Sequence, residues 1–299
     1  MKAIVIDRFG GPEELHEAEL PDPQPGPGQV RVRVEAVGVN PADGKARSGL
    51  IASPDTTFPL VPGLEAAGVV DAMGDGVTDV AVGDRVVGFA EGGAYAELAV
   101  LSTYAALPDS LDATVAVSLP VAGETARRVL RLLDVRPGET LLVHGASGAV
   151  GAVATQLAVA SGATVIGTAS AANQDRVAAL GATPTTYGEG WLERVRALAP
   201  SGVDAVLDAS GAGVLDGSVE LLGGADRLVT IADPAAFTRN ITFSGTSERS
   251  AEELADLVAR RASGEVTTTI SRVLPLAEAA AAQQLSDSGR AGGKLVLVP

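Results

Sequence analysis

The segment Leu141-Leu142-Val143-His144-Gly145-Ala146-Ser147-Gly148-Ala149-Val150-Gly151 decides the fold of this chain. An apolar run leads into a turn of small residues spaced by glycines, and a helical pattern of small residues follows. A strand, a tight turn and a helix N-terminus with free N–H groups form the arrangement that binds a pyrophosphate. The segment therefore makes a dinucleotide the leading ligand hypothesis.

The long uncharged surroundings of this turn admit two other interpretations. Residues 140–174 contain no Asp, Glu, Lys or Arg, and a membrane span would also lack these charged residues. However, glycines interrupt the run repeatedly, and a buried strand–helix–strand unit is also almost continuously apolar. The glycines could also be simple turn formers, because the spacing G-x-x-G-x-x-G is a weak signal by itself. A second apolar strand at residues 164–168 favours the dinucleotide site.

Composition excludes several classes of function. The chain has 299 residues and a net charge of −15, which argues against a nucleic-acid surface and against anionic membranes. It contains no cysteine and only two histidines, His16 and His144, so a metal site would need carboxylates alone, and no tight Asp/Glu cluster is present. The N-terminus lacks the features of a signal peptide, so the cytoplasm is the expected location.

Periodicity divides the chain into two kinds of structure. Val30, Val32 and Val34 alternate with charged residues, and short strands separated by Gly and Pro turns predict a barrel-like β-rich part. Strands are expected there at residues 1–7, 30–34, 66–71, 85–89 and 95–100.

From about residue 114 strands alternate with helices, which predicts a doubly wound parallel sheet of six strands, an α/β fold. The strands are expected at 140–143, 164–167, 185–187, 203–208, 227–231 and 241–244, and the helices at 123–133, 149–161, 174–180, 192–198 and 213–221. The tail should form a helix at 250–261, a strand at 271–274, a helix from 276 and a last strand, and return to the first domain. The expected domains are residues 1–116, 117–246 and the returning segment 247–299.

The residues after the second strand of this sheet bear on the choice between NAD and NADP. NAD sites place an acid about 20 residues beyond the glycine turn, and residues 168–174 contain none. Ser170, Asn173 and Arg176 would suit a 2′-phosphate, which favours NADP, although Ser170 could simply cap a helix. Tyr187, Ser210 and Ala232 follow later strands and are expected near the ligand, although a tyrosine at a strand end is more often only packed there.

With these elements in order, the chain resembles the zinc-free medium-chain dehydrogenase/reductases of the quinone oxidoreductase (zeta-crystallin-like) branch. The resemblance covers essentially the whole chain and implies a GroES-like first domain, a Rossmann second domain, a cleft between them and a homodimer. It is carried by the glycine turn and by the segments Asn40-Pro41-Ala42-Asp43, Pro62-Gly63-Leu64-Glu65-Ala66-Ala67-Gly68, Gly83-Asp84-Arg85-Val86, Gly93-Ala94-Tyr95-Ala96-Glu97 and Gly293-Lys294-Leu295-Val296-Leu297.

The resemblance also implies roles for single residues. Asn40 and Thr125 match positions near the nicotinamide, and Ala146 to Val150 match the pyrophosphate turn. Asn40 could instead be a turn residue, and Glu65, which zinc-containing relatives hold near a metal, is expected to bond to backbone. Phe243, Ser244 and Gly245 match the segment beside the carboxamide, and Lys294 matches a lysine at the rim of the cleft.

The expected activity is NADPH-dependent hydride transfer to a small quinone or an α,β-unsaturated carbonyl, without a metal. Asn40 and Lys45 are candidate donors to the developing anion, and Asp43 either orients Lys45 or caps a short helix. Glu124 stands where many relatives are small or apolar, and residues 48–54 lack a tyrosine that many relatives carry. The alternatives are an enoyl reductase of a biosynthetic, polyketide-like pathway, and a non-catalytic NADPH-binding structural or regulatory protein.

Overall fold

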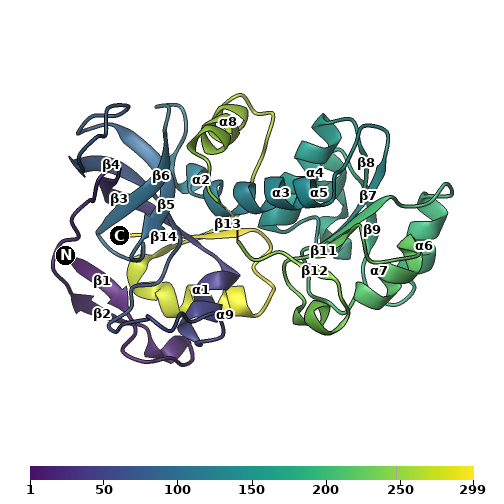
Figure 1. Cartoon of the computed structure of the whole chain (residues 1–299), viewed down its shortest axis with the longest axis horizontal. Helices are drawn as coiled ribbons and strands as arrows, with labels where there is room; N and C mark the ends of the chain where they lie inside the picture. The colour runs from purple at the N-terminus through teal and green to yellow at the C-terminus, as the bar shows by residue number, and fades with distance from the viewer. Residues whose placement is uncertain (247) are drawn as a thin grey trace. The chain divides into compact units, whose positions relative to one another are not determined.

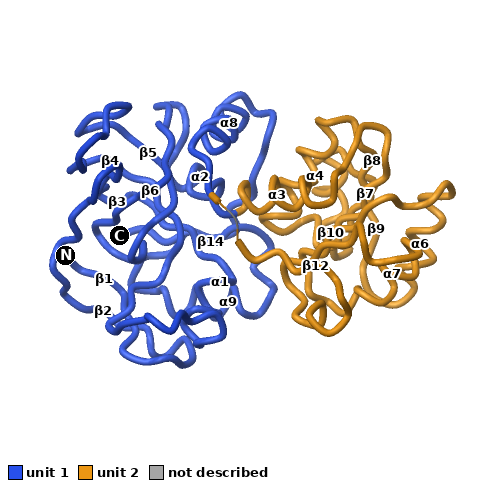
Figure 2. The backbone as a smooth tube through the Cα atoms, in the orientation of Figure 1, with its two compact units in different colours: residues 1–121, 249–299 blue, residues 122–248 orange. Residues whose placement is uncertain are grey.

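The computed structural model describes residues 1–246 and 248–299, arranged as two compact units (Figure 2). Unit 1 combines Met1–Val121 with Arg249–Pro299, and unit 2 is Ala122–Glu248. The chain therefore leaves unit 1 once and returns to it. Residue 247, the expected start of the returning segment, lies outside the described residues.

Unit 2, drawn in teal and green in Figure 1, is built on a six-stranded sheet. Every pair of neighbouring strands is parallel, and the strand order is β12-β11-β10-β7-β8-β9. The predicted doubly wound sheet is thus confirmed, and its order reverses between β7 and β10. Its strands are β7 (Thr140–His144), β8 (Thr164–Ala169), β9 (Thr183–Thr186), β10 (Ala205–Asp208), β11 (Leu228–Thr230) and β12 (Thr242–Phe243).

Helices connect these strands and pack on the apolar side chains that β7, β8, β10 and β11 carry. Leu142, Ile166, Val206 and Leu228 lie in one buried cluster with residues of the connecting helices. Burial of such side chains supplies most of the driving force for the layered fold. The helices are α3 (Pro120–Leu132), α4 (Ala149–Ala160), α5 (Gln174–Ala179), α6 (Trp191–Leu198) and α7 (Leu215–Leu222), with short 3-10 turns η2 (Ala171–Asn173) and η3 (Pro234–Thr238).

Unit 1 contains a second six-stranded sheet, with the order β13-β14-β3-β4-β5-β6, and a hairpin of β1 and β2. Strand β3 also pairs with β6, so strands β3 to β6 close on themselves as a small barrel. The alternating Val30, Val32 and Val34 point into its core. The strands are β1 (Lys2–Val5), β2 (His16–Glu19), β3 (Val30–Val39), β4 (Glu65–Met73), β5 (Arg85–Glu91), β6 (Leu98–Ala106), β13 (Ile270–Pro275) and β14 (Lys294–Val298).

The returning tail completes this sheet, because β14 pairs antiparallel with β3 and parallel with β13. The helices of unit 1 are α1 (Pro41–Arg47), α2 (Ala113–Ala116), α8 (Ala251–Ala262) and α9 (Ala279–Asp287), with 3-10 turns η1 (Pro12–Glu14) and η4 (Leu276–Glu278).

One expected strand begins later than predicted. The strand expected from Tyr95 starts at Leu98, and Tyr95 lies in the preceding turn. There the Tyr95 N–H donates to the Pro62 carbonyl, the Tyr95 carbonyl accepts from Ile4, and the ring is fully buried. The apolar character of Tyr95 therefore reflects burial in a turn rather than a place in the sheet.

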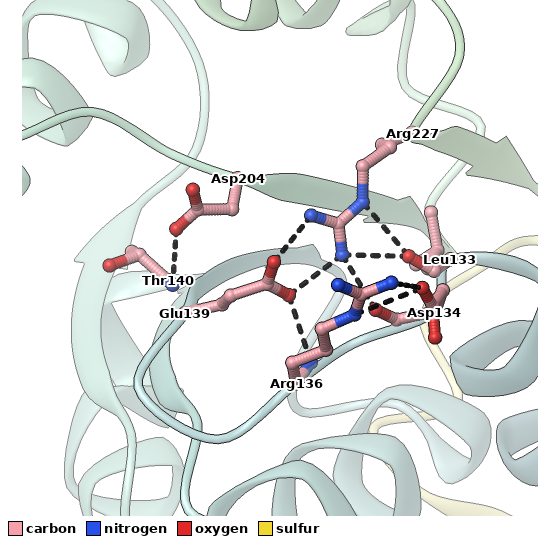
Figure 3. Close-up of polar contacts among 7 residues, drawn as sticks. All are labelled: Leu133, Asp134, Arg136, Glu139, Thr140, Asp204 and Arg227. Carbon is pink, nitrogen blue, oxygen red and sulfur yellow. Dashed lines mark hydrogen bonds and ion pairs between the residues drawn. The ribbon is translucent and has the colours of Figure 1, made fainter.

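A polar network fastens the edge of unit 2 at which β7, β10 and β11 begin (Figure 3). The Arg227 guanidinium donates to the Leu133 carbonyl at 2.8 and 3.0 Å and to the Asp134 carbonyl at 2.9 Å, and both oxygens of Glu139 accept from it at 2.7 Å. Glu139 also accepts from the Arg136 N–H at 2.8 Å. The network satisfies carbonyls just beyond α3 and joins them to the sheet.

The ion pair in this network should contribute stability that depends on pH. The hydrogen-bonded Arg227 lowers the pKa of Glu139 from 4.5 to about 2. Since the folded pKa is the lower one, the contribution is complete above pH 4.5 and is lost as pH falls toward 2. After allowance for solvent screening, Glu139→Gln should lower the free energy of unfolding at pH 7 by about 1–2 kcal/mol.

Urea denaturation of wild type and Glu139→Gln at pH 7 and at pH 3 measures this effect, and the difference should shrink at the lower pH. Glu220→Gln is the matched control, because Glu220 pairs with Arg196 at an exposed site. Its effect should stay within about 0.5 kcal/mol. An equal loss for both variants would contradict a special role of the network.

Candidate functional site

In the glycine turn after β7, the backbone at Gly145 and the backbone at Gly151 lie at van der Waals distance from each other. Gly145 has φ of 77°, and a Cβ at Gly151 would lie 2.3 Å from the Gly145 carbonyl oxygen. Both positions therefore require glycine. The Ala146 N–H donates to the Thr168 carbonyl at 3.0 Å and ties the turn to β8. The start of α4 is pressed directly against the end of β7.

The N-terminus of α4 carries no side-chain cap. Gly148 is the N-cap residue, and no side chain caps this end of the helix. A Cβ at Gly148 would meet only the Gly145 oxygen, at 3.3 Å. The first N–H groups of the helix, at the positive end of its dipole, are therefore not occupied by a side-chain cap and can donate to an anion such as a phosphate. A strand, a glycine turn and a helix N-terminus without a side-chain cap form the arrangement that binds a pyrophosphate in dinucleotide sites.

Buried polar side chains hold the neighbouring loops at the same edge of the sheet. The Thr168 hydroxyl contacts His144 Nδ1 at 3.2 Å and accepts from the Gly145 N–H at 3.3 Å. Burial lowers the pKa of His144 to about 4, so the imidazole is neutral at pH 7. His144 is thus a buried structural residue beneath the turn, and the sequence did not predict this role.

Asp208, at the end of β10, shapes the next two loops. It is fully buried and accepts from the Ser210 N–H at 2.9 Å, the Ser210 hydroxyl at 2.8 Å and the Gly211 N–H at 3.1 Å. Its second oxygen accepts from Thr230, whose hydroxyl accepts in turn from the Ala232 N–H at 3.1 Å. The predicted ligand residues Ser210 and Ala232 are therefore positioned by Asp208 and Thr230. Sequence reasoning missed both, although each is a polar residue ending a buried strand.

The residues predicted for the 2′-phosphate gather beside the turn. Arg176 donates to the Ser147 carbonyl at 2.5 Å, and the Asn173 amide lies 3.4 Å from the Ser147 hydroxyl. Ser170 directly precedes η2 as its N-cap residue, and its hydroxyl makes no capping hydrogen bond. Burial lowers the pKa of the Arg176 guanidinium below its ordinary value. These side chains form a polar corner next to the α4 N-terminus.

Tyr187 lies at the end of the third strand, β9, with its N–H donating to the Ala169 carbonyl at 3.3 Å. The side chain is 58% exposed. It lines a cavity of about 410 Å³ together with Trp191, Ala212 and Val214. The loops after β9 and β10 thus leave room for a ring-sized group at the same edge of the sheet.

The residues predicted for the nicotinamide end are joined by a residue that the sequence analysis missed. Arg128 hydrogen-bonds to Thr125, Ser244 and the Gly245 carbonyl. Phe243 stands apart from these bonds and packs on Phe237, with ring centroids 4.9 Å apart.

In unit 1, three predicted residues meet in a buried polar cluster. The Asn40 amide donates to Glu65 at 2.8 Å, and the Lys294 ammonium donates to Asn40 Oδ1 at 2.6 Å and pairs with Glu65. The second oxygen of Glu65 accepts from the Val121 N–H at 2.8 Å. A Cβ at Gly38 would collide with Glu65, which explains the glycine there. The expectation that Glu65 bonds to backbone describes only one of its oxygens, because the other is bound to Asn40 and Lys294.

Asp43 extends this cluster. Its carboxylate accepts from the Asn40 N–H at 2.8 Å, which caps α1, and from the Tyr95 hydroxyl at 3.0 Å. Burial raises the pKa of Asp43 to about 7. Lys45 is half-buried, and within residues 1–246 and 248–299 its ammonium has no hydrogen-bond or ion-pair partner. Asp43 therefore caps the short helix, and the alternative that it orients Lys45 is wrong.

Comparison with known proteins identifies the family. Residues 26–109 match the family model of the alcohol dehydrogenase GroES-like domain, and residues 180–297 match that of the zinc-binding dehydrogenase. Quinone oxidoreductase of Rattus norvegicus is 31% identical over 323 aligned residues, which cover 100% of this chain and 98% of that protein. The chain belongs to the medium-chain dehydrogenase/reductase family. The family resemblance seen in the sequence is thereby confirmed.

Solved structures agree over the full length. The crystal structure of Escherichia coli quinone oxidoreductase complexed with NADPH is 27% identical, with a TM-score of 0.88 and coverage of 100% of both chains. The crystal structure of an NAD-dependent alcohol dehydrogenase is 33% identical, with the same TM-score of 0.88 and coverage of 100% of both chains. This medium-chain dehydrogenase/reductase is therefore similar to proteins named for either nicotinamide cofactor.

The residues of this family member do not fit a zinc ion. The chain has no cysteine, and the described residues contain no group of three or more His, Asp or Glu side chains able to hold a metal. Glu65, a member of the buried polar cluster, has its carboxylate oxygens bound to Asn40, Lys294 and the Val121 N–H. Of the helices that the structure describes, none has both the length and the apolar character required to cross a membrane.

The buried carboxyl group of Asp43 should make stability fall with rising pH. Its folded pKa of about 7 lies above the ordinary 3.8, so the folded state keeps a proton that the unfolded state releases. The contribution of Asp43 to stability is therefore highest below pH 3.8 and declines until about pH 7. Relative to wild type, Asp43→Asn should gain on the order of 4 kcal/mol between pH 4 and pH 8.

Chemical denaturation of both proteins across this pH range tests the shift. Asp109→Asn, at an exposed loop position, is the matched control and should keep the wild-type profile. Parallel profiles for wild type and Asp43→Asn would show that Asp43 is ionised in the folded protein throughout.

Proposed function

We propose that the protein transfers hydride from NADPH to a quinone or an α,β-unsaturated carbonyl compound, without a metal ion. The observation that carries this proposal is the uncapped α4 N-terminus at the glycine turn, which fits a pyrophosphate. Relatives named quinone oxidoreductase, one of them crystallised with NADPH, support the cofactor and the class of reaction.

The polar corner beside the turn supports NADP rather than NAD. Ser170, Asn173 and Arg176 supply a hydroxyl, an amide and a positive charge, and residues 168–174 contain no carboxylate that would repel a 2′-phosphate. The cavity lined by Tyr187 and Trp191 would accept a ring of the adenosine.

The glycine turn and the α4 N-terminus would hold the dinucleotide, which would supply a hydride from C4 of its reduced ring when bound. The acceptor then becomes an enolate or a hydroquinone anion, which needs a hydrogen-bond donor and one proton. Both amide hydrogens of Asn40 are directed to protein oxygens, at 2.8 Å to Glu65 and at 3.4 Å to Gly38. We therefore assign Asn40 a positioning role and Lys45 the donor role, with water as the final proton source.

Two observations support catalysis without a metal. The ammonium of Lys294 sits against Glu65, and no cysteine is available to bind zinc. Electron-poor acceptors need less polarisation than alcohols or simple ketones, so hydride transfer to them does not require a Lewis acid.

Following NADPH absorbance with a panel of quinones, enones and enoyl thioesters tests the activity. Oxidation with quinones or enones supports the proposal, whereas turnover restricted to enoyl thioesters would identify a biosynthetic enoyl reductase. Tight NADPH binding without oxidation across the panel would instead identify a non-catalytic binding protein.

Gly148→Val should abolish cofactor binding without unfolding unit 2. The new Cβ meets only one backbone oxygen, at 3.3 Å, but the side chain covers N–H groups that the pyrophosphate needs. The loss of two charge-assisted hydrogen bonds corresponds to an NADPH affinity at least about a hundredfold lower by calorimetry.

The matched control is Gly224→Val, because a Cβ at Gly224 meets nothing within 4 Å and the residue precedes β11 at the opposite edge. This control should bind NADPH as wild type does. Wild-type affinity in Gly148→Val would refute the assignment of the turn.

Ser170→Asp should shift cofactor preference toward NADH. A carboxylate there would repel the 2′-phosphate and accept from ribose hydroxyls, changing the ratio of the two dissociation constants by at least about tenfold. Ser201→Asp, at an exposed position before β10, adds the same charge elsewhere and should leave the ratio unchanged. An unchanged ratio in Ser170→Asp would argue against the polar corner as the phosphate site.

A further inference from the structure

Unit 2 largely buries an ion pair in the middle of α3. Arg128 Nε donates to Glu124 Oε1 at 2.7 Å and Nη2 lies 3.2 Å from Oε2, in the i, i+4 spacing of a helix. The side chains of Arg128 and Glu124 are only 6% and 14% exposed. Burying two charges costs several kcal/mol before their attraction is counted. An exposed pair such as Arg196–Glu220 does not carry this desolvation cost. The burial of the Glu124–Arg128 pair therefore calls for a functional explanation.

The remaining donors of Arg128 reach a segment far away in the chain. Nη1 hydrogen-bonds to the Ser244 hydroxyl, and Nη2 donates to the Gly245 carbonyl at 3.2 Å. Residues 244 and 245 directly follow β12 and form no regular structure of their own. The planar guanidinium, with its fixed fork of donors, therefore fastens this irregular segment to α3.

The same guanidinium also fixes the Thr125 hydroxyl. Nη2 lies 3.3 Å from Thr125 Oγ1, while this hydroxyl donates to Glu124 at 3.3 Å. Because its proton is directed to Glu124, Thr125 presents a lone pair, an acceptor, to any neighbouring group. Glu124 and Arg128 thus set both the position and the polarity of this hydroxyl.

We propose that Arg128, held by Glu124, is a positioning residue that fixes the protein surface contacting the nicotinamide half of the dinucleotide. This inference rests on the proposed function, and on Thr125, Ser244 and Gly245 being the residues that the family resemblance implies for the nicotinamide end. A carboxamide has two N–H donors and one carbonyl acceptor, so it is recognised only if acceptors and donors stand at fixed places. Arg128 provides that rigidity without itself being required to contact the cofactor.

The experiment separates positioning from stability by removing both charges together. The double variant Glu124→Gln/Arg128→Met leaves no unpaired buried charge, and replacing a buried ion pair in this way is often neutral for stability. Calorimetric titration then compares NADPH with adenosine 2′,5′-bisphosphate, which lacks the nicotinamide half. A purely structural role would move both affinities or neither.

The double variant should bind NADPH about tenfold more weakly and adenosine 2′,5′-bisphosphate within about twofold of wild type. The increase in NADPH fluorescence on binding, which reports the surroundings of the reduced ring, should also be smaller. The exposed pair on α6 and α7 gives the matched control, Arg196→Met/Glu220→Gln, which should keep wild-type values for both ligands.

Arg128→Lys is a second variant, which tests the inference even if the double variant does not fold. It keeps the charge beside Glu124 but offers a point charge in place of a fork, so NADPH affinity alone should again fall by about tenfold. Unchanged NADPH affinity, or an equal loss for both ligands, in a folded variant would overturn the inference. If the wild-type protein binds neither ligand, the proposed function fails and the inference fails with it.

Discussion

The close contact between α4 and the end of β7 is the constraint on which the candidate site depends. With only 2.3 Å between an ideal Cβ at Gly151 and the Gly145 oxygen, any side chain there would push the helix away from the turn. The contact aims the uncapped N–H groups of α4 at the space beside Gly148. The proposed site for an anion is thus made from backbone, with no cationic side chain required at its centre.

Buried polar groups around this backbone site hold the loops rather than the ligand. Thr168, Asp208 and Thr230 lie at the ends of neighbouring strands and accept from the N–H groups of Gly145, Ser210 and Ala232 in the adjoining loops. His144 contacts the Thr168 hydroxyl. Because each such bond replaces water in a dry interior, losing one partner would leave a buried group unpaired. The loops at the carboxyl edge are therefore preorganised before any ligand arrives.

Unit 1 also contains buried polar groups that bond to one another, and some of these groups carry full charges. Lys294 neutralises Glu65, and Asn40 bridges the two, so a charged cluster lies within a β-rich core. Asp43, which has no cation bonded to it among the described residues, carries instead a raised pKa caused by burial. Lys294 reaches the cluster because β14 pairs with β3. The returning tail thus completes the polar cluster as well as the sheet.

Local pattern in the sequence determined the alternation of strands and helices, the six parallel strands and the glycine turn, because these depend on side-chain periodicity and on backbone freedom within a few residues. The sequence also singled out Asn40, Thr125, Ser244 and Lys294, but only through resemblance to a family. Tertiary structure alone decided that Lys294 lies against Glu65, that Arg128 joins Thr125 to Ser244, and that Tyr95 sits in a buried turn. Such contacts join residues far apart in the chain, and their energy depends on burial and geometry that no local pattern encodes.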